Sequence, residues 1–295
     1  MKPTLKRLTV AGAAAGLVAT GFGAQAAPQA PQAPTTPTLK ATIASGKMTV
    51  VGDTSFPAGR LNVSLTAVDK ESEISFITLH QGYTFQDFRS DLKAFFSSYN
   101  KQGQPSKAGL QHLRHVIKNV TAYGGLDVLK GKTGNATLLI PKSAGETIID
   151  NDSGNLPTQK TDLTVGAASG PQALPTTAAR VVAQTNKRFG GATTLPAKGT
   201  FTYKNASTES PHFLFMQHVK EGTTRKQVIA GLQSNAKPSY VRAGAMGTDV
   251  LTTNEAQTVQ TNLPAGEYAL MCFFPDPQTG QPHAFMGMVR MVHLK

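Results

Sequence analysis

The sequence predicts an all-β protein made of two tandem Greek-key β-sandwiches, each with a short helical insertion. Short segments with alternating apolar and polar residues recur along the 295 residues, and Gly, Pro and Asn stand between them, as is typical of antiparallel sandwiches. The same order of segments then occurs a second time. A chain of this length has room for two domains with cores of their own, and 39% hydrophobic residues is ordinary for a folded protein.

The N-terminus has the features of an export signal. Basic residues precede an apolar stretch that ends near residue 23, and small residues at 24–26 suit cleavage. We therefore predict a signal peptide at residues 1–26 and a flexible Pro- and Ala-rich leader at 27–39. No later segment reaches the roughly 18 apolar residues of a membrane-spanning helix. We expect a secreted or periplasmic protein without a membrane span.

The internal repeat is seen in four pairs of similar segments. They are 56–63 with 195–202, 82–92 with 222–232, 120–129 with 241–251, and 143–146 with 264–267. The offset is shorter in the last two pairs, which predicts an insertion in the first copy around residues 99–117. We expect a first domain at 40–168 and a second at 179–295, joined near 167–178.

Each copy predicts a strand, a polar turn, a second strand, a helix, a glycine-rich stretch and two more strands. In the second copy, residues 222–232 have Thr near the start and apolar residues at helical spacing, so we predict a short amphipathic helix. Residues 257–263 alternate with period two. Tyr268, Leu270 and Cys272 share one strand face, which we expect to point inward.

Cys272, the only cysteine, ends a strand-like segment. In an oxidising compartment a disulfide needs a second cysteine, so this thiol is buried, reactive or bound to something. A small buried hydrophobe is the plain alternative. His283 and Met288 follow after a loop with Pro and Gly. A thiolate, an imidazole and a weak thioether, joined by a second imidazole, suit copper in both oxidation states.

This segment resembles the C-terminal ligand loop of the cupredoxins, the blue-copper superfamily of plastocyanin and azurin. In that family a strand ends in Cys, and a loop, a His and then a Met follow, often as Gly-Met. Cys272, His283 and Gly287-Met288 match this pattern, with ten residues between Cys272 and His283. The resemblance implies cupredoxin-like sandwiches and is closest to bacterial secreted two-domain cupredoxin-like proteins.

The resemblance also places the first histidine after a strand that ends in Asn and a turn. The strand-like segment 200–205 ends in Asn, and Pro211-His212 follows a polar turn. His212 is therefore the predicted ligand, with His218 as the alternative. In the family, the residue after this histidine donates a backbone hydrogen bond to the thiolate, and here it is Phe213. The implied site is one type-1 copper ion with the ligands His212, Cys272, His283 and Met288.

Apolar residues flank the implied ligands, and two further histidines lie in the inserted segment. An apolar collar that limits water at the metal would consist of Phe273, Phe274, Phe285 and Met286. Residues 148–157 of the first copy, which match the ligand segment, contain no Cys, His or Met, so we expect no copper there. His112 and His115 lie in the inserted segment, and we expect them to be surface residues outside the site.

Two-domain cupredoxins include multicopper oxidases and copper nitrite reductases, so an enzyme must be considered. By resemblance to the oxidases, a trinuclear copper centre would be bound by a set of His-x-His pairs. The seven histidines of this chain form no such pair. We do not expect an enzyme. The predicted function is single-electron transfer at one copper ion. Two alternatives stay open: copper storage or delivery with the same ligands, and a metal-free exported binding or structural module of the same fold.

The charge of the chain indicates the kind of partner. The formal net charge is +12, which favours an acidic redox partner protein or an anionic cell surface through long-range attraction. Nucleic acid is not expected as a partner after export.

Overall fold

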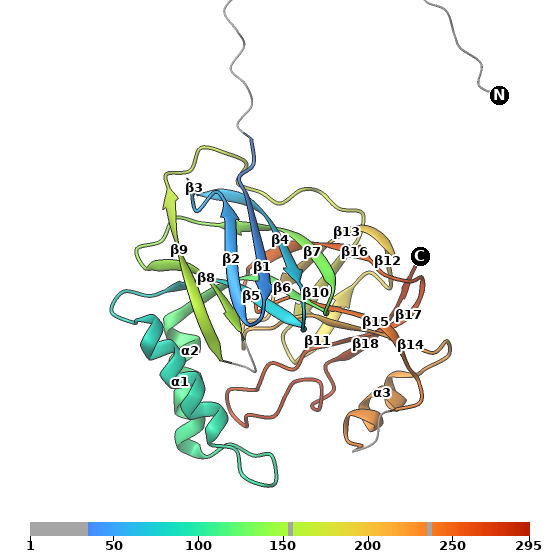
Figure 1. Cartoon of the computed structure of the whole chain (residues 1–295). Helices are drawn as coiled ribbons and strands as arrows, with labels where there is room; N and C mark the ends of the chain where they lie inside the picture. The colour runs from blue at the N-terminus through green and yellow to red at the C-terminus, as the bar shows by residue number, and fades with distance from the viewer. Residues whose placement is uncertain (1–34, 153–155, 235–237) are drawn as a thin grey trace, which may run out of the picture. The chain divides into compact units, whose positions relative to one another are not determined.

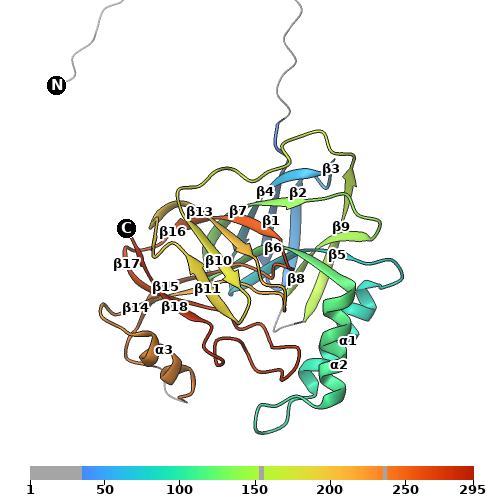
Figure 2. The same ribbon diagram turned by 180° about the vertical axis from the view of Figure 1, so that it is seen from behind.

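The computed structural model describes residues 35–152, 156–234 and 238–295 (Figure 1 and Figure 2). The predicted signal peptide and the leader up to residue 34 lie outside the described residues. The described residues form one compact unit. Its first strand begins at Thr38, two residues before the expected start of the fold, because Leu39, Ala41 and Ile43 alternate as buried residues of one strand face.

The elements follow one another in two series. The first half contains β1 (Thr38–Ala44), β2 (Lys47–Gly52), β3 (Ser55–Pro57), β4 (Gly59–Ala67), β5 (Ser72–Leu79), α1 (Phe85–Ser97), α2 (Lys107–Asn119), β6 (Val120–Val128), β7 (Lys132–Ile140), β8 (Glu146–Asp152) and β9 (Pro157–Gly166). The second half contains β10 (Arg180–Gln184), β11 (Arg188–Gly191), β12 (Thr194–Leu195), β13 (Lys198–Asn205), β14 (Phe215–Val219), α3 (Arg225–Leu232), β15 (Val241–Gly247), β16 (Ala256–Asn262), β17 (Gly266–Met271) and β18 (Val289–Leu294).

Two sheets contain all of these strands. The 8-stranded sheet has the order β11-β10-β13-β16-β7-β4-β1-β2, and the 10-stranded sheet has the order β12-β18-β17-β14-β15-β6-β5-β8-β9-β3. Each half has its own core, and each core contains buried apolar residues from both sheets. The sheets therefore pack face to face as sandwiches, which confirms the predicted all-β fold class.

The strand pairing of the first half is repeated in the second. The parallel pair β1 and β4 corresponds to β10 and β13, and the antiparallel pair β4 and β7 corresponds to β13 and β16. In the other sheet, β5 pairs with β6 and β8 just as β14 pairs with β15 and β17. The hairpin of α1 and α2 stands where the second half has α3 alone, so α2 is the insertion that the sequence offset predicts.

Both sheets run across the boundary between the halves. β16 pairs with β7, and β15 pairs with β6. At this seam the Gln257 side chain accepts from the N–H of Gly125 at 2.9 Å and donates to its carbonyl at 3.1 Å. Gly124 has φ +100°, and a Cβ there would lie 1.9 Å from the Gln257 amide oxygen. Only glycine allows this approach, which gives the glycine-rich stretch of the first copy a structural role.

The helices cover outer faces of the 10-stranded sheet. α1 and α2 pack on buried residues of β5, β6 and β8 in one cluster, and α3 packs on β14, β17 and β18 in another. α1 and α3 each begin with a capping box, at Thr84 and Thr224. The predicted helix at 222–232 is thus present, with Val228 as its buried residue. Among the described residues, no helix combines the length and apolar character needed to cross a bilayer.

Candidate metal centre

Cys272 lies directly after β17, at the inner end of a strand that is buried on both faces. Tyr268, Leu270 and Cys272 are each 0% exposed and belong to the core of the second half, as the alternation predicts. The residues between them, Ala269 and Met271, are buried against α3. The strand therefore holds the thiol inside the sandwich rather than at its surface.

His212 lies between β13 and β14 and is held there by backbone and side-chain hydrogen bonds. Its N–H donates to the Leu251 carbonyl at 3.1 Å, and the Leu251 N–H donates to its carbonyl at 2.8 Å. The fully buried Asn205 at the end of β13 donates to the Ser210 carbonyl at 3.1 Å and to that of Leu251 at 2.8 Å. The turn that carries His212 is therefore anchored on both sides.

His283 lies in the ligand loop, residues 272–288, between β17 and β18. Its N–H donates to the Phe274 carbonyl at 3.0 Å, and the N–H of Ala284 donates to the Cys272 carbonyl at 2.6 Å. At the far end of the loop, the N–H of Met288 donates to the His283 carbonyl at 2.9 Å. These bonds fold the loop back on itself and bring His283 over Cys272.

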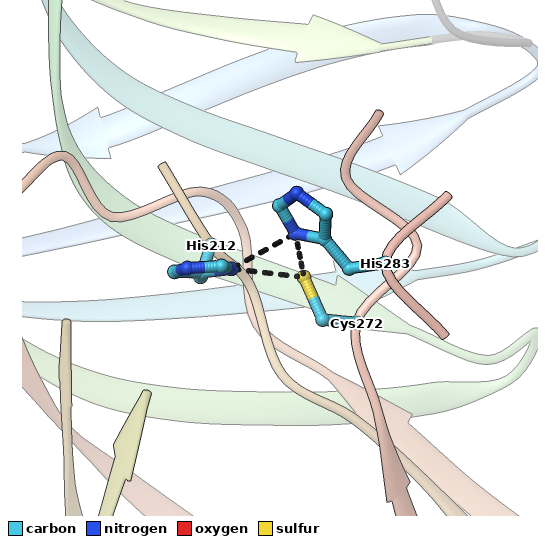
Figure 3. A group of neighbouring side chains, drawn as sticks. All are labelled: His212, Cys272 and His283. Atoms are coloured by element: carbon cyan, nitrogen blue, oxygen red, sulfur yellow. Dashed lines mark hydrogen bonds between the residues drawn. The ribbon is translucent and has the colours of Figure 1, made fainter. Parts of the chain in front are cut away.

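The three side chains point toward one another (Figure 3). The Cys272 Sγ lies 3.6 Å from His212 Nδ1 and 3.7 Å from His283 Nδ1, and the two Nδ1 atoms are 3.0 Å apart. All three residues are 0% exposed. Within residues 35–152, 156–234 and 238–295, this is the one group of three or more His, Cys, Asp or Glu side chains with a spacing suited to a metal ion.

The spacing and donor chemistry fit a metal ion. Atoms at these separations lie about 2.0 Å from their common centre, close to a metal–nitrogen bond length and slightly under a metal–sulfur bond length. At 3.5 Å, His212 Nε2 faces the Ser210 hydroxyl, a partner that favours an unprotonated Nδ1. A thiolate with two imidazoles is a soft donor set that suits copper.

Burial sets the protonation of these groups. Burial, helped by the neighbouring His283 and Lys187, lowers the pKa of His212 to about 3. Burial also lowers the pKa of His283 to about 4, against the opposing charge of Asp276. Burial raises the pKa of the Cys272 thiol to about 12, although the backbone N–H groups of Phe213 and Phe274 donate to it and act in the other direction. The rings are neutral at pH 7 and the thiol is protonated.

The Phe213 hydrogen bond is the backbone contact that the resemblance implied for the residue after the first histidine. It is made by the main chain, so a phenylalanine provides it as well as a polar residue does. Met288 is 0% exposed and belongs to the same core cluster as Cys272. The structure thus brings His212, Cys272 and His283 together and buries Met288 in the surrounding core.

His218, the alternative ligand, lies elsewhere. It is part of β14, where its ring stacks on Tyr268 with centroids 4.8 Å apart and its Nδ1 donates to the Ala243 carbonyl at 2.9 Å. The apolar collar is also only partly present. Phe274 packs 6.0 Å from the His283 ring, whereas Met286 is 40% exposed. Met286 lies in the final turn of the loop, between the buried residues Ala284 and Met288.

Contacts far apart in sequence hold the tip of the ligand loop. Asp276 accepts from the N–H groups of Gln278 and Thr279 at 3.0 and 2.9 Å and pairs with Lys187 at 3.1 Å. From the α1–α2 hairpin of the first half, the Arg114 guanidinium donates to the Pro277 carbonyl at 3.0 Å, and the Tyr99 hydroxyl donates to that of Gly280 at 2.8 Å. Sequence reasoning missed these residues, since no local spacing links them to the site.

The inserted histidines form a separate cluster. His112 and His115 of α2 both use Nδ1 to bond the Asp91 carboxylate of α1, at 2.7 and 2.6 Å, and Tyr83 donates to the same carboxylate at 2.7 Å. The cluster ties the two helices of the hairpin together, apart from the His-Cys-His group.

The strand pairing is repeated in the two halves, and the buried His-Cys-His group stands at the positions of the ligand-loop pattern. This chain therefore has the fold and the donor group that its resemblance to the cupredoxins implies. No protein-family model and no curated protein matches it. The structure is similar to auracyanin from Roseiflexus castenholzii, at 19% identity and TM-score 0.26 over 39% of this chain and 94% of that one.

Two other solved structures give comparable values. Auracyanin A, a "blue" copper protein from Chloroflexus aurantiacus, has 18% identity and TM-score 0.26 over 39% of this chain and 96% of its own. The copper-containing nitrite reductase of Thermus scotoductus SA-01 has 10% identity and TM-score 0.21 over 88% of this chain and 61% of its own. At such TM-scores the matches carry no argument, and the resemblance to the cupredoxins rests on the strand pairing and the His-Cys-His group.

Proposed function

We propose that the protein is an exported copper protein that holds one ion in a type-1 site and transfers single electrons. The ligands would be His212, Cys272, His283 and Met288. One observation carries the proposal: a thiol and two imidazole nitrogens converge at separations of 3.0 to 3.7 Å in a fully buried position.

The chemistry of the donors favours electron transfer. A bound copper ion supplies the one-electron chemistry, and thiolate with two neutral imidazoles is acceptable to Cu(II) and Cu(I) alike. The residues of the chain keep these donors in place. Asn205 fixes the turn of His212, and Asp276 fixes the loop of His283. A site whose ligands are positioned before the metal arrives needs little rearrangement when an electron moves.

Copper binding is tested on the purified mature protein. Added Cu(II) should produce an intense thiolate charge-transfer band at about 600 nm. The Cys272→Ser variant should lose the band and keep its circular dichroism spectrum, and the His218→Ala variant should retain the band. Absence of the band in the wild type would remove the type-1 proposal.

The axial ligand is tested by a matched pair of substitutions. Met288→Leu conserves volume in the core and removes a weak donor to Cu(II), so we expect the band to persist and the reduction potential to rise. Met286→Leu, two residues away and exposed, should leave the potential unchanged. Tight binding of Cu(I) without a reversible voltammetric wave would favour copper storage or delivery instead.

The partner and the compartment are part of the same proposal. The formal net charge of the full sequence is +12, of which Lys2, Lys6 and Arg7 in the predicted signal peptide supply three, so the exported protein would stay basic. Such a charge favours an acidic redox protein or an anionic cell surface as partner. Export rests on the signal-peptide pattern at residues 1–26. N-terminal sequencing of the mature protein from the producing cells should give a sequence that begins after residue 26. Finding the protein in the cytoplasmic fraction with residues 1–26 still attached would contradict export.

A further inference from the structure

A cavity of about 630 Å³ lies beside the His-Cys-His group, under the α1–α2 hairpin. Both halves of the chain line it, with the hairpin on one side and strands of the 10-stranded sheet and the ligand-loop region on the other. Cavities that hold small molecules span about 300 to 1,000 Å³. This cavity therefore has the size of a ligand site.

Much of its wall is aromatic or aliphatic. The hairpin contributes Phe88, Phe95 and Ile117 among others, and the region around the candidate metal ligands contributes Phe213, Phe273 and Phe274 among others. Such a surface binds an apolar body by removing it from water. Aromatic faces also attract a cation placed over them.

The polar part of the lining is dominated by carboxyl groups. Glu71, Asp127 and Asp249 line the cavity together with Glu73 and Asp150, and Lys70 is the one cationic side chain among the lining residues. Asp249 is 5% exposed. Burial, then the charges of Glu71 and Asp249, raises the pKa of Asp127 to about 7. A cationic group near Asp127 would offset this crowding of negative charge.

We propose that this cavity binds a small organic cation with an apolar body, of the aryl-alkyl ammonium class. The ammonium lies by the carboxyl groups of Glu71, Asp127 and Asp249, and the apolar body lies between the hairpin and the phenylalanines next to the metal ligands. Charge complementarity decides the sign of the ligand: five acidic side chains face one lysine.

The cavity and the metal centre share a wall. Phe213 follows His212 and Phe274 is two residues after Cys272, and the backbone N–H groups of both donate to the thiol. A cation bound in the cavity would therefore contact the residues whose N–H groups donate to the Cys272 thiol. Binding of the cation does not depend on copper, so it is tested on the metal-free protein.

The experiment is calorimetric titration of the metal-free protein with 4-phenylbutylammonium. 4-Phenylbutan-1-ol and 4-phenylbutyrate are the comparison ligands, because they have the same phenyl-alkyl body and differ in the charge of the terminal group. We expect one saturable site for the ammonium and at least tenfold weaker binding of the alcohol and the carboxylate. Equal binding of ammonium and alcohol, or no binding of the ammonium up to about 10 mM, would overturn the proposal.

Two variants and one control locate the binding. Asp127→Asn removes a carboxyl that would ionise beside the ammonium, without changing shape, and should weaken ammonium binding about tenfold. Ile117→Trp should fill the cavity and weaken binding at least as much. Glu221→Gln removes an exposed carboxylate outside the cavity and should bind as the wild type does. Circular dichroism confirms folding of each variant. If Asp127→Asn and Ile117→Trp both bind as tightly as Glu221→Gln, the cavity is not the site.

Discussion

Cys272 and the two histidines start from opposite protonation states before a metal binds. The low pKa values of His212 and His283, about 3 and about 4, leave both rings neutral, whereas the thiol of Cys272 has a pKa of about 12. Since a bound metal would take the thiolate form, metal uptake would expel one proton. We expect release of close to one proton per ion at about pH 8, seen as a dependence of the binding enthalpy on the ionisation enthalpy of the buffer.

The matched variant for this prediction is Cys272→Ser. It retains both rings and offers a hydroxyl that stays protonated, so any residual binding should release no proton. Equal proton release by the wild type and Cys272→Ser would contradict the assignment of the thiol as a ligand.

Asp127 makes the free energy of unfolding depend on pH. The pKa of its carboxyl is raised from 3.8 to about 7, first by burial. Between these values the folded protein holds a proton that the unfolded chain has released, so the free energy of unfolding falls as pH rises. From about pH 4 to about pH 7, we expect the wild type to lose up to about 4 kcal/mol relative to Asp127→Asn.

Denaturant unfolding at a series of pH values measures this difference. Glu221→Gln, which changes an exposed carboxylate, should follow the wild-type profile. Parallel profiles for Asp127→Asn and the wild type would mean that the carboxyl is not protonated in the folded protein.

The residues of the His-Cys-His group could be chosen from the sequence, whereas those of the cavity could not. His212, Cys272 and His283 could be chosen because each stands at a recognisable place relative to a strand end. Their convergence rests on main-chain hydrogen bonds that any residue can make, such as the one from Phe213. Glu71, Asp127 and Asp249 form no motif in the sequence, because each comes from a different segment and only the fold brings them to one cavity.

Among the elements, the ligand loop depends on the hairpin of the other half. Arg114 donates to the Pro277 carbonyl at 3.0 Å, and a hydrogen bond of this kind contributes about 0.5 to 1.5 kcal/mol. We expect Arg114→Ala to loosen the loop and speed copper release to a chelator about two- to tenfold. Stopped-flow absorbance of the copper-loaded protein measures the rate.

Lys118→Ala, an exposed change on the same helix, is the control and should release copper at the wild-type rate. Tyr99→Phe removes the hydroxyl that bonds the Gly280 carbonyl and should act in the same direction as Arg114→Ala. Unchanged rates in both hairpin variants would show that the loop holds its shape without the hairpin.

The order of elements was readable because each has a local signature. The cap at Thr224, the alternation up to Cys272 and the shortened offset around the insertion are all short-range signals. β16 shows the limit of such reasoning. Gln257, Thr258 and Val259 are all buried. Thr258 lies on the face that also carries the exposed Gln260, and its hydroxyl accepts from the Thr137 N–H of the first half at 3.1 Å. A period-two pattern predicts that position to be exposed.

For the whole molecule, the continuity of both sheets predicts cooperative unfolding. Gln257 is 0% exposed and satisfies both backbone groups of Gly125 across the seam. Replacing it by Leu leaves these groups buried without partners, which costs about 1 to 3 kcal/mol. We expect a single unfolding transition for the wild type, and a single transition at lower denaturant for Gln257→Leu.

Circular dichroism and tyrosine fluorescence should give coincident denaturation curves. Gln260→Leu, an exposed position in the same strand, should change stability by less than about 0.5 kcal/mol. Two separate transitions in the wild type would mean that each half is stable without the other. The sequence predicts two sandwiches joined near residues 167–178. No local pattern indicates that the Thr137 N–H would donate to the Thr258 hydroxyl at 3.1 Å, because the two residues are far apart in the chain.

The complete enclosure of the three donor side chains has a consequence for how copper would be acquired and lost. An ion in solution cannot touch any of them while the native packing is intact, so loading waits for a transient opening of the segment between β17 and β18. Release waits for the same opening. The residence time of the ion would then be governed by local unfolding of that segment, and a chaperone that delivers copper would have to act on the opened form.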